Sequence, residues 1–266
     1  MNLDLKIILP VVIAFCISVV LCPIVIPFLK KLKFGQFVRD DGPQAHLKKA
    51  GTPTMGGLII LLSFTITTLI YMKDYPDVLP VLFVTLGFGL IGFIDDYIKV
   101  VMKRSMGLRA WQKMLGQIVV TGVFAYYVEK YSTINNELII PFVGKTIQLN
   151  SVLYVVLLFF IVLGTVNGAN FTDGLDGLAS SVTVLIATFF AVVAVGTGSG
   201  VAPVSCAAVG SLLGFLVYNV YPARVFMGDT GSLALGGFVS AMAFMLKMPI
   251  FIVIVAFIYL IEALSD

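Results

Sequence analysis

A polar stretch interrupts the apolar sequence of this chain, and it reads Asn167-Gly168-Ala169-Asn170-Phe171-Thr172-Asp173-Gly174-Leu175-Asp176-Gly177-Leu178-Ala179. Polar clusters are costly in a membrane and are retained where something binds. Asp173 and Asp176 are three residues apart, so one helical turn would place both on one face. Glycines let backbone amides approach a ligand closely, and carboxylates suit a hard cation with the phosphates that it carries. We interpret the stretch as part of an active site set into a membrane-embedded bundle.

The composition around this stretch is that of an integral membrane protein. Of the 266 residues, 59% are apolar and 12% charged, and the mean hydropathy is +1.06. A soluble domain could not bury so much apolar surface. The net charge of +3 and the lack of a basic-aromatic stretch argue against a nucleic-acid partner. Three cysteines lie in apolar runs without a Cys-x-x-Cys pair, which predicts neither a disulfide nor a zinc site, and the single histidine, His46, excludes a site built from several histidines of this sequence.

The apolar segments predict an all-α polytopic bundle of about nine transmembrane helices in a single domain covering 1–266. About 20 residues are needed for each span. The N-terminal run has no cleavage site typical of a signal peptide, so we expect it to be a retained first span. The predicted spans are 7–29, 56–72, 78–98, 112–130, 151–167, 178–196, 201–219, 231–247 and 249–264.

The basic residues predict how these spans are oriented. Twelve of the 17 lysines and arginines fall on the side that holds the loops 30–55, 95–113, 168–177 and 220–230. The positive-inside rule places that side in the cytoplasm and the N-terminus outside. On the outer side, short β-prone runs around Pro141 and Gly144 in segment 131–150 predict a small external β-hairpin, with a plain polar loop as the alternative.

Three further polar clusters lie on the predicted cytoplasmic side. The loop from Arg39 to Gly57 is rich in turn residues and could offer amides and cations to an anion, although an ordinary positive-inside loop also fits. Asp95-Asp96 ends the third span, where carboxylates oppose the helix dipole, so we favour a functional role over a simple helix end. Asp229 lies where the eighth span begins, as a helix cap or an anion-binding helix start. In the basic run from Lys99 to Lys113, most side chains are expected at lipid headgroups and one or two near a bound phosphate.

Together these clusters indicate metal-dependent phosphoryl transfer. Five carboxylates, glycine-rich turns and lysines are the groups that this reaction uses with Mg²⁺, and no serine–histidine or cysteine–histidine pair offers another nucleophile. The membrane-surface location predicts one lipid substrate and one soluble substrate. An ion-conducting transporter would spread its carboxylates through the span centres, whereas here they gather at one surface.

Four motifs make the prediction more specific: HLKKAGTPTMGG from His46, FIDDY from Phe93, NGANFTDGLDGLA from Asn167 and VFMGDTGSLALGG from Val225. In order and spacing they resemble the polyprenyl-phosphate N-acetylhexosamine-1-phosphate transferase superfamily over nearly the whole chain. The GTPTMGG string points to the branch that transfers phospho-MurNAc-pentapeptide from its UDP carrier to undecaprenyl phosphate, giving lipid I and UMP. The resemblance implies Mg²⁺ as cofactor, a bacterial cytoplasmic membrane location with the active site on the cytoplasmic face, and a homodimer. A related transferase with another UDP-N-acetylhexosamine is the alternative.

The resemblance also implies roles for individual residues. Asp229 would bind magnesium, Asp95 would deprotonate the lipid phosphate, and Asp96 would complete the catalytic set. Phe226 would stack on uracil in a nucleotide pocket. The other implied substrate-binding residues are Lys48, Lys49, Thr54, Asn167, Asn170, Asp173, Asp176 and Ser232. Members of the superfamily have ten spans and a histidine-rich cytoplasmic segment, so the resemblance predicts that this chain is C-terminally incomplete and raises the alternative of an inactive truncated copy.

Overall fold

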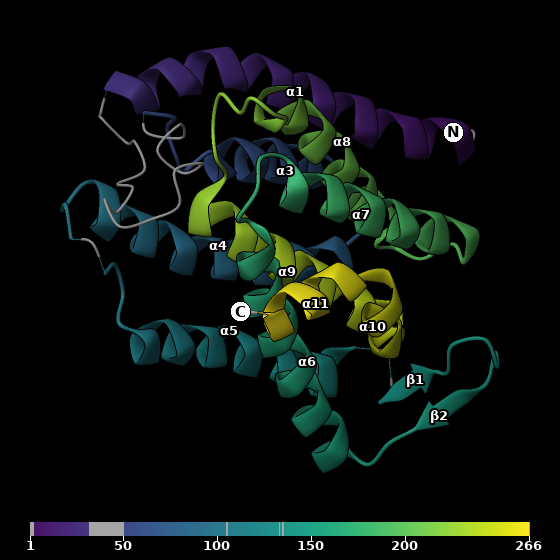
Figure 1. The fold of residues 1–266 in the computed structure, drawn as a ribbon. Helices are drawn as coiled ribbons and strands as arrows, with labels where there is room; N and C mark the ends of the chain where they lie inside the picture. Colours follow the sequence, from purple (N-terminus) through teal and green to yellow (C-terminus); the bar gives the residue numbers. More distant parts are fainter. Residues whose placement is uncertain (1–2, 32–50, 105, 133, 135, 266) are drawn as a thin grey trace.

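The computed structural model describes residues 3–31, 51–104, 106–132, 134 and 136–265. These residues are mainly helical, with one two-stranded sheet (Figure 1). By length and composition, five of the described helices could span a membrane, and a shorter apolar helix, α3 (Gly57–Tyr71), accompanies them. The five are α1 (Leu3–Lys31), α4 (Val78–Val100), α6 (Ser151–Thr172), α7 (Leu178–Gly196) and α8 (Ala202–Asn219). The predicted all-α polytopic membrane fold is confirmed.

Helix α9 (Gly228–Met245) forms the centre of the bundle. Every residue from Thr230 to Phe244 is buried. Figure 1 shows α3, α4, α6 and α7 around it. Small residues allow this close packing, as is usual between membrane helices. A Cβ added at Gly236 would lie 2.5 Å from Cα of Val166 in α6, and one at Gly57 would lie 2.2 Å from the backbone nitrogen of Gly231. Helix α9 is therefore packed closely against α6 and α3.

Two predicted spans differ from the structure. Helix α6 continues to Thr172, beyond the predicted end at 167, so the loop 168–177 is shorter than expected. Within this extension, Gly168 lets α6 pass close to the backbone of Tyr259, where a Cβ would be 2.8 Å from the carbonyl oxygen. The predicted span 249–264 is not one helix. It consists of η1 (Pro249–Phe251), α10 (Ile252–Val255) and α11 (Phe257–Ser265), broken at Ala256, and no helix-breaking residue explains that break.

The predicted hairpin is present. Strand β1 (Glu137–Ile139) pairs antiparallel with β2 (Thr146–Gln148), with Glu137 opposite Gln148. It is fixed to the turn after α9, because Ile139 N–H donates to the Lys247 carbonyl at 2.7 Å and the Lys247 ammonium lies 2.5 Å from the Glu137 carboxylate. This leaves the opposite end of the bundle, where α4 and α6 end and α9 begins, for the polar clusters.

Candidate active site

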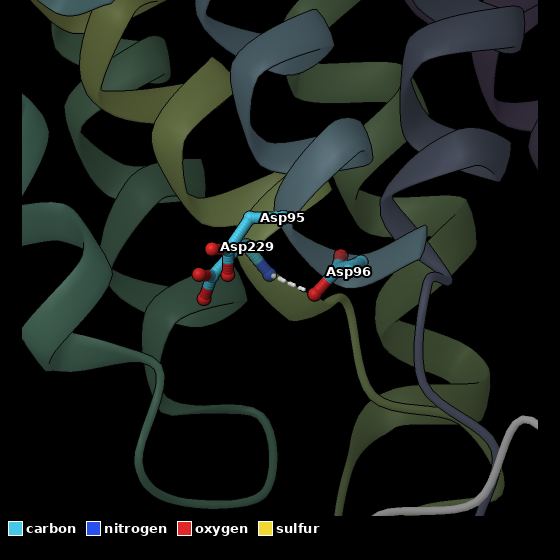
Figure 2. A group of neighbouring side chains, drawn as sticks. All are labelled: Asp95, Asp96 and Asp229. Carbon is cyan, nitrogen blue, oxygen red and sulfur yellow. Dashed lines mark hydrogen bonds between the residues drawn. The ribbon is translucent and has the colours of Figure 1, made fainter. Parts of the chain in front are cut away.

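Four helices bring polar side chains together at one end of the bundle. Asp95 and Asp96 lie in the last turns of α4, and Asp229 lies in the first turn of α9. Figure 2 shows the Asp95 and Asp229 carboxylates next to each other and the Asp96 carboxylate beside them, hydrogen-bonded to the backbone nitrogen of Asp229. Helix α5 (Ala110–Tyr131) contributes Lys113 from its first turns, and α6 contributes Asn170 from its last. Segments far apart in the sequence therefore meet at Asp229.

The Asp96 carboxylate holds the N-terminus of α9. Its Oδ1 accepts the backbone N–H of Asp229 at 3.2 Å. Its Oδ2 accepts the backbone N–H and the hydroxyl of Thr230 at 2.8 and 2.6 Å. The first N–H groups of a helix have no partner within the helix, and a carboxylate there also complements the helix dipole. Asp96, which is 4% exposed, is thus a cap supplied by a neighbouring helix.

Two glycines allow this contact. A Cβ at Gly92, one turn before Asp96 in α4, would lie 2.0 Å from the carbonyl oxygen of Asp229. Gly228 has a φ of +71°, and a Cβ there would lie 2.6 Å from Oδ2 of Asp96. The backbones of α4 and α9 therefore approach each other as closely as the Asp96 hydrogen bonds require.

Both oxygens of the Asp229 carboxylate have partners. Oδ2 accepts from the ammonium groups of Lys99 at 3.0 Å and Lys113 at 2.7 Å. Oδ1 accepts from the side-chain amide of Asn170 at 2.9 Å, and the same amide nitrogen lies 2.7 Å from the Ser232 hydroxyl. The Asp229 side chain is 18% exposed, so a ligand could still reach it.

Asp95 faces the same two lysines from α4. Its Oδ2 lies 2.5 Å from the Lys99 ammonium and 3.7 Å from that of Lys113. Its Oδ1 accepts the backbone N–H of Leu108 at 2.8 Å, which fixes the chain leading into α5. Lys99 and Lys113 therefore lie between Asp95 and Asp229. Counted formally, with every carboxylate ionised, three carboxylates against two ammonium groups give this cluster one net negative charge.

The carboxylates fit a divalent metal ion. Asp95, Asp96 and Asp229 each offer an oxygen, and the three oxygens lie within 4.8 Å of one another. Carboxylate oxygens are the ligands that Mg²⁺ prefers. Oδ2 of Asp95 and Oδ2 of Asp229 both lie within ion-pair distance of the Lys99 and Lys113 ammonium groups. Two ligands of one metal ion would face the same positive charge in this way. Both oxygens of Asp96 accept from the backbone or hydroxyl of α9, whereas the Oδ2 atoms of Asp95 and Asp229 face lysine ammonium groups that a metal ion could replace, so Asp95 and Asp229 are the better placed ligands.

The segment 52–57 lies against the chain that enters α9. Pro53 O accepts the N–H of Phe226, and the N–H groups of Gly56 and Gly57 donate to the carbonyls of Phe226 and Met227, each at 2.8 Å. Thr54 in this segment is buried, and so is Phe226, which is 9% exposed. The GTPTMGG motif is therefore part of the structure that positions Asp229.

Three of the remaining predicted residues lie in α6 or in the turn that follows it. Asp173 follows the last residue of α6, and Asp176 accepts the N–H of Ala223 at 3.1 Å, which joins the turn after α6 to the loop before α9. Asn167 forms an amide pair with Gln117 of α5. The predicted substrate-binding residues Lys48 and Lys49 lie outside the described residues.

Several residues of the cluster were not singled out from the sequence. The basic run after α4 did not show which of its members reach the carboxylates. Lys99 lies four residues after Asp95, and this helical spacing was a usable signal. Lys113 carries no such signal, because its position depends on the chain between α4 and α5. Gly92 likewise acts through a contact between helices distant in sequence.

Comparisons with known proteins show which sequences this chain resembles. Residues 78–247 match glycosyl transferase family 4, and residues 49–61 match signature 1 of the phospho-N-acetylmuramoyl-pentapeptide-transferases. The chain is similar to the phospho-N-acetylmuramoyl-pentapeptide-transferase of Caldicellulosiruptor bescii, with 49% identity over 99% of this chain and 82% of the relative. The enzymes of that name from Clostridium botulinum (strain Alaska E43) and Bacillus subtilis (strain 168) are 51% and 47% identical over 94% and 99% of this chain, and 77% and 82% of their own lengths.

Proposed function

The chain belongs to the phospho-N-acetylmuramoyl-pentapeptide-transferases of glycosyl transferase family 4, and from this premise we propose its reaction. It transfers phospho-MurNAc-pentapeptide from UDP-MurNAc-pentapeptide to undecaprenyl phosphate, giving lipid I and UMP. The observation that carries the proposal is the meeting of Asp95, Asp229 and two lysines at the start of α9. The part of signature 1 that includes Gly56 and Gly57 is hydrogen-bonded to the segment leading into that helix start.

The cofactor of the proposed reaction is Mg²⁺, held by Asp229 and Asp95. When bound, it offsets negative charge on the pyrophosphate of the donor and so stabilises the transition state. A divalent cation would change the net charge of the cluster from one negative to one positive, which suits a site that holds two phosphorylated substrates. Lys99 and Lys113 would then be free to contact phosphate oxygens.

The reaction proceeds as a direct displacement. An oxygen of undecaprenyl phosphate attacks the phosphorus attached to MurNAc, a phosphorus–oxygen bond forms there, and the bond from that phosphorus to the UMP oxygen breaks. Oδ2 of Asp95 would bind the metal, and its Oδ1, which keeps one lone pair beside the Leu108 N–H, would take any proton that remains on the attacking phosphate. Because phosphate is largely ionised at neutral pH, this gains only a modest factor, and most of the acceleration comes from positioning the two phosphates.

The nucleotide side of the site is assigned to the turn after α6. Asn170 lies in the last turn of α6, Asp173 and Asp176 follow in the turn after it, and Ser232 lies beside the Asn170 amide. Phe226, Thr54, Lys48 and Lys49 complete the proposed pocket for uracil and the donor phosphates. The excess of lysine and arginine on this side of the membrane supports a cytoplasmic location, where the soluble donor is found. A homodimer is the proposed assembly.

A donor competition tests the reaction. The purified chain in detergent, supplied with undecaprenyl phosphate and Mg²⁺, should release UMP from UDP-MurNAc-pentapeptide at least about tenfold faster than from UDP-N-acetylglucosamine, a discrimination of about 1.4 kcal/mol. Equal or faster release from UDP-N-acetylglucosamine would replace the proposed donor with another UDP-N-acetylhexosamine.

A further inference from the structure

A reciprocal amide pair joins α5 and α6 one helical turn below the carboxylates. The Asn167 amide donates to Oε1 of Gln117 at 2.9 Å, and the Gln117 amide donates to Oδ1 of Asn167 at 3.3 Å. The Asn167 amide also donates to the Leu163 carbonyl at 2.8 Å, within its own helix. Gln117 is fully buried. Buried Asn and Gln side chains hydrogen-bond across helices in membrane proteins, where water offers no competing partner.

Each member of this pair lies one turn from a residue that contacts Asp229. Gln117 is four residues after Lys113 in α5, and Asn167 is three residues before Asn170 in α6. Both spacings place the two side chains on one face of their helix. Lys113 and Asn170 contact different oxygens of the same Asp229 carboxylate, at 2.7 and 2.9 Å.

The hydrogen bonds of Lys113 and Asn170 depend on the register between the two helices. A slip of one residue moves a helix by about 1.5 Å along its axis. That shift would lengthen either contact beyond hydrogen-bonding distance, which ends near 3.2 Å. The register of α5 against α6 therefore decides whether an ammonium and an amide reach Asp229 together.

In the half of α5 near the site, Gln117 is the only buried side chain. None of the other residues from Ala110 to Val120 is buried, whereas Thr121, Phe124 and Val128 are buried in the second half. Met114, Leu115 and Ile118 are exposed apolar side chains that would face lipid equally well after a small rotation or slip. Lipid tails are as apolar as these side chains, so the hydrophobic effect does not decide which of them faces lipid, whereas a two-way amide pair is directional.

We propose that Gln117 and Asn167 are positioning residues: their amide pair sets the register of α5 against α6 and thereby brings Lys113 and Asn170 to Asp229. The kinetic consequences of this proposal rest on the transferase reaction proposed above. Asn167 then acts through Asn170 and Lys113 and does not touch the donor, which differs from the substrate-binding role predicted from its motif.

Four variants test the pair kinetically through UMP release. Gln117→Met and Asn167→Leu each remove one partner at similar volume, and a third variant combines them. The fourth exchanges the residues, Gln117→Asn with Asn167→Gln, and keeps both amides and their summed length. Thr121→Val is the matched control, since Thr121 is buried one turn farther along α5 and its hydroxyl bonds only to the Gln117 carbonyl of its own helix, at 2.7 Å.

The kinetic result expected is a loss in kcat with a steady KM. Each single variant should lower kcat about tenfold or more, because a misplacement of 1 Å can cost up to about 100-fold and part of it is absorbed by the flexible Lys113 side chain, and KM for the UDP-sugar should change less than about threefold. The combined variant should lose no more of its kcat than the worse single variant. The exchanged pair should have a kcat within about threefold of that of the unsubstituted chain, as expected for coupled partners. Thr121→Val should keep its activity.

A distance measurement tests the register without the reaction. Spin labels at Met114 and Phe171, which are 41% and 46% exposed, report the separation of α5 and α6 in a Cys16→Ser background. The unsubstituted helices should give one narrow distance distribution. Gln117→Met and Asn167→Leu should shift or broaden it by about 1.5 Å, and the exchanged pair should restore it. If the chain releases no UMP at all, the proposed reaction fails while this measurement still decides the register.

Three outcomes would overturn the proposal. The first is an Asn167→Leu variant that raises KM for the UDP-sugar while Gln117→Met leaves it unchanged, because Asn167 would then contact the donor. The second is a combined variant in which the kcat losses of the two single variants add in free energy. The third is an unchanged distance distribution in both single variants.

Discussion

Thr230 donates both its backbone N–H and its hydroxyl to one oxygen of Asp96, at 2.8 and 2.6 Å. The other oxygen of Asp96 accepts the N–H of Asp229. A carboxylate at the end of α4 therefore holds the first turn of α9. That turn includes Asp229, the proposed metal ligand. In this account Asp95 and Asp96, although adjacent, have different tasks.

The first prediction concerns the Asp96 cap. Asp96→Asn replaces one accepting oxygen with an NH₂ group, so a buried donor of α9 loses its partner, and the variant should be destabilised by about 1–3 kcal/mol. Thr230→Val removes only the hydroxyl and should cost about 0.5–1.5 kcal/mol. Thermal unfolding in detergent measures both, with Thr121→Val as the control for losing a buried threonine hydroxyl. An Asp96→Asn variant with an unchanged unfolding midpoint would contradict the capping role.

The second prediction concerns the approach of α4 to α9. In Gly92→Ala, the added methyl carbon would lie 2.0 Å from the Asp229 carbonyl oxygen, so α4 and α9 must move apart. We expect turnover to fall at least about 100-fold, as misplacement of a reacting group by 1 Å does. Gly164→Ala in α6 is the control, because no atom lies within 4 Å of its added Cβ. Equal activities of the two variants would show that the close approach is not needed.

The third prediction concerns the metal ligand. Asp229→Asn should abolish most turnover and its dependence on Mg²⁺, because a carboxamide binds a hard cation much more weakly than a carboxylate. The protein should still fold, since Asp96 continues to hold α9 through the backbone. Asp74→Asn, an exposed acid between α3 and α4, is the control. Wild-type turnover in Asp229→Asn would remove this residue from the site.

The fourth prediction separates the two substrates. Asp173→Asn should weaken UDP-sugar binding by about tenfold and leave lipid phosphate binding within about twofold, because the turn after α6 is assigned to the nucleotide and one charged hydrogen bond contributes about this much. Equilibrium binding of UMP and of undecaprenyl phosphate to the same preparation measures the two effects. Equal losses would contradict this division of roles.

Much of the fold could be predicted because hydropathy follows directly from the membrane environment. The bounds of α4 and α7 agree closely with the predicted spans 78–98 and 178–196, and the hairpin near 131–150 was readable from its turn residues. The end of α6 was misplaced because polar residues suggested a loop. In the structure, the chain around Asn167 and Asn170 stays helical, since each amide finds a partner on a neighbouring helix.

The site was predictable in its carboxylates and unpredictable in its contacts. The motifs named Asp95, Asp96 and Asp229, and the structure places them together. The sequence could not show that Asp96 bonds to α9, or that Gln117 meets Asn167, because both contacts join helices far apart in the chain. Such pairings are set by how close the helix backbones come, which depends on glycines such as Gly92.

The most direct test of the central claim is the rate of UMP release by this chain in detergent with undecaprenyl phosphate and UDP-MurNAc-pentapeptide, measured with Mg²⁺ and with the metal removed by chelation. The account predicts release with Mg²⁺, a loss of at least about 100-fold on chelation, and recovery when Mg²⁺ is restored. Release at the same rate with and without the metal would contradict the claim that Asp95 and Asp229 form a magnesium site for this transfer.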